Sequence, residues 1–161
     1  MSTATAFDLK SALLSQLTQI TDAYVSDLGF IPADKMTVSP MGKARTPVDF
    51  TAECAGFNFM VAKTLAGEAI QPRSDEERQA YYASLDTYDK AVVEFKKSVE
   101  ALKTGLEGAT EEHLFSETTT PWGMTVTVYR LLTMAMGHMM YHDGQINYIQ
   151  SLYGDDQNHW G

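Results

Sequence analysis

The chain has 161 residues, of which 44% are apolar and 20% are charged, which is the composition of one ordinary globular domain. No apolar run reaches the roughly 18 residues that a membrane-spanning helix requires. The 21 acidic and 12 basic side chains give a formal net charge of −9, which would repel a phosphate backbone. We therefore expect a protein that binds neither a membrane nor nucleic acid.

The N-terminal segment, residues 1–6, is short and polar and contains no basic stretch followed by an apolar one. This pattern lacks the features of an export signal and predicts a cytoplasmic protein. Cys54 is the only cysteine, so it cannot form a disulfide within the chain. Its apolar, small-residue surroundings favour a buried thiol over a nucleophile.

Two helices are predicted in the first part of the chain. In residues 9–28 apolar side chains recur every three or four positions, as on one face of a helix. Residues 31–46 contain two prolines and a glycine without a sustained period, which indicates a long ordered connection. Pro47 suits a first helical position behind Thr46 as N-cap. The apolar run over residues 47–65 then predicts a central, buried second helix.

A third helix is predicted to begin at a capping box formed by Ser74 and Glu77, whose side chains can each accept a hydrogen bond from a free backbone amide. Its apolar face continues to Leu102, about eight turns later, and the helix should close near Gly105 or Gly108.

The last part of the chain contains the fourth predicted helix. A short acidic turn is expected at residues 110–113, and the threonines and proline of residues 115–122 favour an extended approach. The last helix should run from residues 123–125 to Gly154, and the polar tail, residues 155–161, is expected to fray. The predicted fold is all-α: a single four-helix bundle domain with a long crossover between its first two helices.

The last helix carries two histidines that could hold a metal ion. His138 and His142 are four residues apart, which on a helix offsets them by about 40° and about 6 Å and lets both imidazoles reach one ion. The same spacing is also compatible with two ordinary core histidines. The other two, His113 in the acidic turn and His159 in the tail, are expected to be solvated.

Glu53 is the candidate third ligand, because it is the only carboxylate between Phe50 and Ala66 on the buried second helix. Burying a lone carboxylate is costly, and a metal ion would neutralise it while leaving coordination positions open for water or substrate. Alternatively, Glu53 could point to a wet edge or become neutral by protonation.

Pro121-Trp-Gly stands before the last predicted helix, and His138-x-x-x-His142-x-Gly144-Gln145 lies within it. With these two motifs the chain resembles the DinB/YfiT-like superfamily of metal-dependent helical bundles. Members begin with a long helix, continue through a proline-containing connection and contribute the remaining ligand from the second helix. The resemblance thus implies the same bundle and a divalent metal site.

One position departs from the family pattern, because members usually place a histidine on the second helix where this chain has Glu53. The implied ligand set is Glu53, His138 and His142, which suits zinc or nickel and tolerates iron or manganese. The alternative is that the site has been lost. Gln145, three residues after His142, could hydrogen-bond to a ligand residue or a bound water and orient it, whereas Asp143 is expected to face solvent.

The resemblance implies a metal-dependent enzyme that acts on a small-molecule substrate. Relatives include thiol-dependent transferases and isomerases, so a transferase or hydrolase that uses a low-molecular-weight thiol is the leading hypothesis. The alternative is a non-catalytic bundle that binds metal or a small ligand during stress. We expect a homodimer in either case.

Overall fold

The computed structural model describes residues 8–159. The N-terminal segment on which the prediction of no export signal rests lies outside this range, as do the last two residues of the tail. Among the described residues, no helix combines the length and the apolar character needed to cross a membrane.

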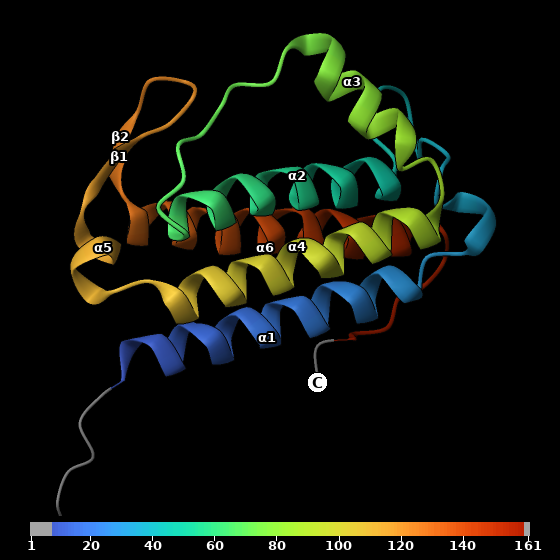
Figure 1. Ribbon diagram of the computed structural model, residues 1–161. Coiled ribbons are helices and arrows are strands. Elements are labelled where there is room, and N and C mark those ends of the chain that lie inside the picture. The colour runs from blue at the N-terminus through green and yellow to red at the C-terminus, as the bar shows by residue number, and fades with distance from the viewer. Residues whose placement is uncertain (1–7, 160–161) are drawn as a thin grey trace, which may run out of the picture.

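Four long helices form the bundle, and Figure 1 shows them lying side by side. They are α1 (Leu9–Gly29), α2 (Pro47–Leu65), α4 (Tyr88–Gly108) and α6 (Val128–Leu152). A long crossover with one short 3₁₀ turn, η1 (Ala33–Lys35), joins α1 to α2. The four-helix bundle and the long crossover predicted from the sequence are therefore confirmed.

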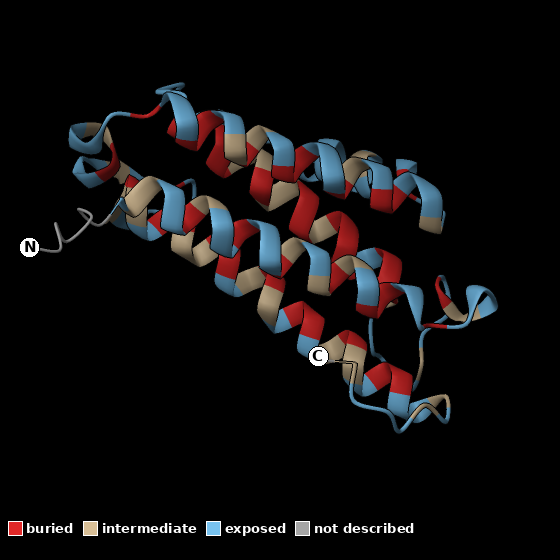
Figure 2. Ribbon diagram, turned by 90° about the horizontal axis from the view of Figure 1, so that it is seen from below, coloured by how far each residue is buried: buried red, intermediate tan, exposed pale blue. Residues whose placement is uncertain are grey.

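The core lies between these four helices, each of which turns an apolar stripe inward (Figure 2). Tyr24 of α1 stacks on Phe95 of α4 with ring centroids 4.6 Å apart, and both side chains are fully buried. The most extensive helix contact joins α2 to α4, while α6 packs against both α1 and α2. This arrangement brings the middle of α2 against the middle of α6.

The prediction of one continuous third helix is wrong, because this segment forms two helices. The first, α3 (Asp75–Ser84), begins at the expected Ser74–Glu77 capping box and has no buried residue. It ends at Leu85, which leaves the helical conformation with φ −103° and ψ 46°. Thr87 then caps α4 by accepting a hydrogen bond from the Lys90 amide. As a result α3 lies apart from the bundle, over α2 (Figure 1).

The segment before the last helix is extended, as predicted for residues 115–122, but it also forms a strand pair that the predicted all-α fold does not include. After a short helix, α5 (Glu111–Phe115), the strands β1 (Glu117–Thr119) and β2 (Thr125–Thr127) form an antiparallel pair. Gly123, with φ 85°, turns the chain between them. Thr127 caps α6, so this helix begins a few residues later than predicted.

Two histidines expected in solvent have partners instead. His113 lies with Nε2 2.8 Å from the Thr64 carbonyl oxygen, which ties α5 to the end of α2. His159 stacks on Phe30 at a centroid separation of 3.6 Å and lies 2.8 Å from an Asp155 carboxylate oxygen. Aromatic and carbonyl partners from distant segments cover both rings, and local sequence does not reveal such partners.

The close approach of α2 and α4 predicts a large effect of one methyl group. In Gly105→Ala the new Cβ would lie 2.9 Å from Leu65 Cβ and 3.1 Å from the Ala62 carbonyl oxygen. We expect the free energy of unfolding, measured with urea, to fall by about 1–3 kcal/mol because the helices must separate.

The matched control is Gly108→Ala, three residues further along α4, where a Cβ would meet nothing within 4 Å. This variant should be neutral or gain up to about 1 kcal/mol from helix propensity. Equal stability of the two variants would contradict the close contact.

Candidate metal centre

Two helices bring the predicted ligand residues together. Glu53 lies in the middle of α2, and His138 and His142 lie one turn apart on α6. The two Nε2 atoms are 3.0 Å apart. The Glu53 carboxylate oxygens lie 3.7 Å from His138 Nε2 and 3.5 Å from His142 Nε2. Side chains from distant parts of the sequence therefore converge on one point.

His142 is held in a single orientation. Its Nδ1 lies 2.7 Å from Gln145 Oε1, and the amide nitrogen of Gln145 donates to the Tyr141 hydroxyl. Since an amide oxygen only accepts, Nδ1 carries the proton and Nε2 presents its lone pair to the cluster. The ring also stacks on Phe50, with centroids 4.8 Å apart.

His138 is less constrained. Its ring packs edge-on against Phe57 at a centroid distance of 5.2 Å. Its Nδ1 is buried and has no hydrogen-bond partner among residues 8–159. Because the lone pair of His142 Nε2 lies 3.0 Å away, His138 Nε2 carries the proton in the metal-free protein. Ligation of an ion through His138 Nε2 would move this proton to Nδ1 or release it.

Glu53 is held as a carboxylate anion. The neighbouring imidazoles of His138 and His142, together with an ion pair with Arg45, hold its pKa well below the usual value despite partial burial. The Arg45 guanidinium also lies 5.0 Å from the Phe50 ring centroid, on the outer side of the cluster. The carboxylate therefore keeps its charge at neutral pH.

The donor set fits a divalent ion. For ligands at about 2.1 Å from a metal, neighbouring donor atoms are about 3.0 Å apart in an octahedron and about 3.4 Å apart in a tetrahedron. The two Nε2 atoms are 3.0 Å apart, Glu53 Oε1 lies 3.7 Å from His138 Nε2, and the other oxygen, Oε2, lies 3.5 Å from His142 Nε2, so each of these contacts is close to those values. Two imidazoles and a carboxylate can thus hold an ion with movements of a few tenths of an ångström.

Cys54 is a second candidate for the third ligand, which the sequence did not suggest. Its sulfur and ring nitrogens of His138 and His142 all lie within 4.8 Å of one another. As predicted, the thiol is fully buried. Burial raises its pKa well above the usual value, so the cysteine is neutral in this environment. Its ligation would require the ion itself to remove the proton.

Asp143 is buried, which contradicts the expectation that it faces solvent. Its two carboxylate oxygens are inaccessible and have no hydrogen-bond partner within the described part of the chain. Burial, together with the nearby Asp27 carboxylate, raises the pKa of Asp143 to about 7. The helical offset from His142 turns Asp143 toward α1, which also covers that face of α6.

A cavity of about 660 Å³ adjoins His138 and Glu53. It lies between α2, α3, the connection over residues 66–74 and the turn between the two strands. Glu53, His138, Phe57 and Trp122 line it. A small molecule in this cavity could therefore reach an ion held by Glu53 and the histidines.

The chain belongs to the DinB family, whose family model matches residues 49–157. This confirms the resemblance noted in the signature of the last helix. No curated protein matches the chain.

Several solved structures share the fold. A mutant of a mycothiol-dependent maleylpyruvate isomerase is 19% identical with a TM-score of 0.73, and the match covers 91% of this chain and 63% of that one. A conserved protein from Enterococcus faecalis is 16% identical with a TM-score of 0.72, covering 91% and 98%. The colibactin self-resistance protein ClbS, in complex with double-stranded DNA, is 14% identical with a TM-score of 0.70, covering 91% and 98%. The isomerase is thus substantially longer than this chain, and the shared feature is the fold.

The buried aspartate predicts how stability depends on pH. Because the pKa of Asp143 is about 7 in the folded protein and 3.8 is the ordinary value, the folded state holds an extra proton between these limits. Stability should therefore fall as the pH rises through this window, by about 2 kcal/mol between pH 5.5 and pH 8.5.

Urea unfolding at both pH values tests this expectation with Asp143→Asn, which should lose most of the decrease and be more stable than the unsubstituted protein at pH 8.5. Asp22→Asn, an exposed position on α1, is the control and should keep the decrease. An unchanged pH dependence in Asp143→Asn would contradict the assignment.

Proposed function

We propose that this protein is a divalent-metal-dependent enzyme that transfers or activates a low-molecular-weight thiol on a small-molecule substrate. The observation that carries the proposal is the convergence of Glu53, His138 and His142 beside a cavity large enough for such a molecule. The mycothiol-dependent isomerase among the structures of the same fold supports the choice of a thiol.

Zinc or nickel suits the two imidazoles and the carboxylate, and iron or manganese would be tolerated. When bound, such an ion would act as a Lewis acid and lower the pKa of a coordinated thiol or water. Glu53, His138 and His142 are the ligands we propose, and Gln145 positions His142 through the hydrogen bond to Nδ1.

The protein's own residues supply the remaining requirements. Phe57 and Trp122, with ring centroids 6.1 Å apart, form an apolar wall beside His138 that would exclude bulk water from a bound substrate. Arg45 forms an ion pair with one side of Glu53. The carboxylate therefore serves better as a ligand than as a general base.

The non-catalytic binding bundle is the second candidate. It is favoured by one observation, namely that Glu53, the carboxylate closest to the histidines, is already engaged by Arg45 and both imidazoles. A homodimer, a cytoplasmic location and the absence of nucleic-acid binding stay predictions from the sequence.

The enzymatic proposal predicts metal-dependent consumption of a thiol. Protein loaded with Zn²⁺ or Ni²⁺ should accelerate the reaction of a small thiol, such as glutathione or cysteine, with an aromatic halide or a cis-alkene acid. Because the histidine pair holds the ion, His138→Ala should lower the rate at least about 100-fold.

His113→Ala is the matched control, because His113 binds the Thr64 carbonyl oxygen away from the cluster, and it should keep full activity. Stoichiometric metal without any thiol or water reactivity would instead support the binding bundle. Equal metal content in His138→Ala and the unsubstituted protein would show that His138 is not a ligand, which would contradict both the enzyme and the metal-binding bundle.

A further inference from the structure

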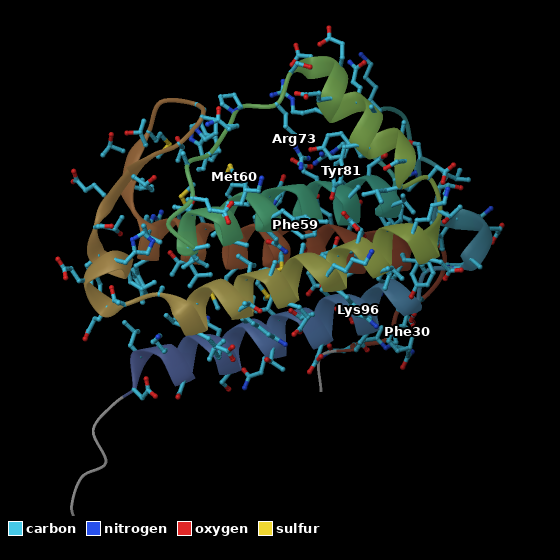
Figure 3. The ribbon with its side chains drawn as sticks, viewed as in Figure 1. Phe30, Phe59, Met60, Arg73, Tyr81 and Lys96 are labelled. Carbon is cyan, nitrogen blue, oxygen red and sulfur yellow. The ribbon has the colours of Figure 1, made fainter. Side chains whose placement is uncertain are left out.

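The cavity beside the histidines has a second end, built from α3 and the connection that precedes it. The aromatic and thioether side chains of its lining come from α2, α3, the strand turn and α6: Phe57, Phe59, Met60, Tyr81, Tyr82, Trp122 and Met134. Figure 3 shows Arg73 and Tyr81 on one side of this space and Met60 and Phe59 of α2 below them. The lining is thus mainly apolar.

The charged residues of the lining are mostly cationic. Lys63, Arg73 and Arg78 contribute positive charges, and Glu53 is the one carboxylate among the lining residues. Glu53 is already paired with Arg45. Arg78 is likewise paired with Asp75, so Lys63 and Arg73 are the lining cations that form no ion pair within residues 8–159, in a chain whose formal net charge is −9. The positive charge around the cavity is opposite in sign to the net charge of the molecule, and it favours an anionic ligand.

Arg73 is suitably placed to bind such an anion. Its guanidinium lies 4.9 Å from the centroid of the Tyr81 ring, so an aromatic face supports the cation. Within residues 8–159 no carboxylate forms an ion pair with Arg73, whereas Arg78 is paired with Asp75. The N–H groups at the edge of the Arg73 guanidinium therefore remain available for bidentate binding of an oxyanion.

The hydroxyl of Tyr81 is a second unused donor at the same end. It is inaccessible to solvent and has no hydrogen-bond partner in the part of the chain that the structure describes. Burial raises the pKa of Tyr81 to about 12, so the hydroxyl keeps its proton. A buried polar group without a partner is costly, and a ligand oxygen would satisfy it.

The two tyrosines of α3 pack against α2 at Gly56. A Cβ at this position on α2 would lie 3.4 Å from Cε1 of Tyr81 and 3.9 Å from the hydroxyl of Tyr82, which is ordinary van der Waals contact. Both tyrosines therefore lie directly against the surface of α2. In this way α3, which has no buried residue of its own, covers the cavity.

We propose that the cavity binds a small amphiphilic anion, whose apolar or aromatic body packs against Phe57 and Trp122 and whose carboxylate, sulfonate or phosphate is bound by Arg73 with Tyr81. The proposal rests on the proposed function in that it names the class of substrate for that site. The apolar body would lie at the end beside His138, and the anionic group at the end beneath α3.

Two fluorescent probes of similar shape test the proposal. One is 1-anilinonaphthalene-8-sulfonate, which carries an anionic group, and the other is N-phenyl-1-naphthylamine, which is neutral. Arg73→Gln should weaken binding of the sulfonate about 10-fold, because a charge-assisted hydrogen bond is lost. It should leave the affinity for the neutral probe unchanged.

Arg130→Gln is the matched control, because Arg130 is an exposed arginine on α6 outside the cavity, and it should bind both probes normally. Arg73→Lys should retain part of the preference for the anion. Equal loss of both probes in Arg73→Gln, no loss of either, or no saturable sulfonate binding to the unsubstituted protein would overturn the proposal.

Competition against the bound sulfonate distinguishes the anionic groups. Phenylacetate, benzenesulfonate and phenyl phosphate should each displace the probe better than neutral benzyl alcohol, and their order identifies the preferred group. Displacement by the alcohol equal to that by all three anions would contradict anion recognition.

The same titration on metal-free His138→Ala separates this proposal from the enzymatic one. Since Arg73 and Tyr81 lie on α3 and its connection, we expect the variant to keep the Arg73-dependent preference for the sulfonate. If His138→Ala keeps the preference for the sulfonate but the unsubstituted protein shows no thiol reactivity, the enzymatic proposal is contradicted and the anion site is supported. If the unsubstituted protein reacts with thiols but the preference for the sulfonate is absent, the anion site is contradicted and the enzymatic proposal is supported.

Discussion

The contact between the middle of α2 and the middle of α6 is the constraint on which the rest of the structure depends. At that contact Glu53 faces His138 and His142, so three polar side chains lie where a bundle would ordinarily place apolar ones. Polar groups in such a position need partners. Gln145, Arg45 and the surrounding aromatic rings supply them.

These partners prepare the cluster as a ligand set. Gln145 fixes the proton of His142 on Nδ1, and Arg45 together with the imidazoles keeps Glu53 ionised. The two Nε2 atoms are left facing each other at 3.0 Å. A divalent ion could accept the Nε2 lone pairs of both histidines and neutralise the Glu53 carboxylate at the same time. A single proton shared between the two Nε2 atoms cannot do this.

The helices outside the bundle explain why the cluster is open to a small molecule. If the third helix had continued unbroken from Ser74, it would have run along the bundle and left the outer face of α2 bare. The break at Leu85 and the cap at Thr87 instead turn α3 back over α2. Together with the turn that carries Trp122, α3 encloses the cavity beside His138.

Much of this could be predicted from the sequence, and what could not has physical reasons. Helical periodicity and caps predict the bundle helices, which the structure confirms. The choice of Glu53, His138 and His142 as ligands stays a prediction from spacing and the family signature. The break before Thr87 was missed because Tyr81, Leu85 and Tyr88 keep helical spacing across it. Periodicity therefore does not detect a change of helix direction.

The remaining differences arise from packing between distant segments. Asp143 lies one residue after His142, and only the position of α1 shows that its carboxylate is covered. Cys54 adjoins Glu53 in sequence, yet its approach to the histidines depends on how α2 and α6 cross. Arg45 reaches Glu53 from the crossover, whose path the sequence does not specify.

The visible absorption spectrum of the protein titrated with Co²⁺ tests the central claim most directly, because cobalt reports both binding and the type of ligand. Ligation by Glu53, His138 and His142 predicts saturable d–d bands at one Co²⁺ per chain, without a sulfur-to-metal charge-transfer band. The bands should be lost in Glu53→Gln and kept in Cys54→Ser. A charge-transfer band that disappears in Cys54→Ser, or no saturable bands at all, would contradict the account.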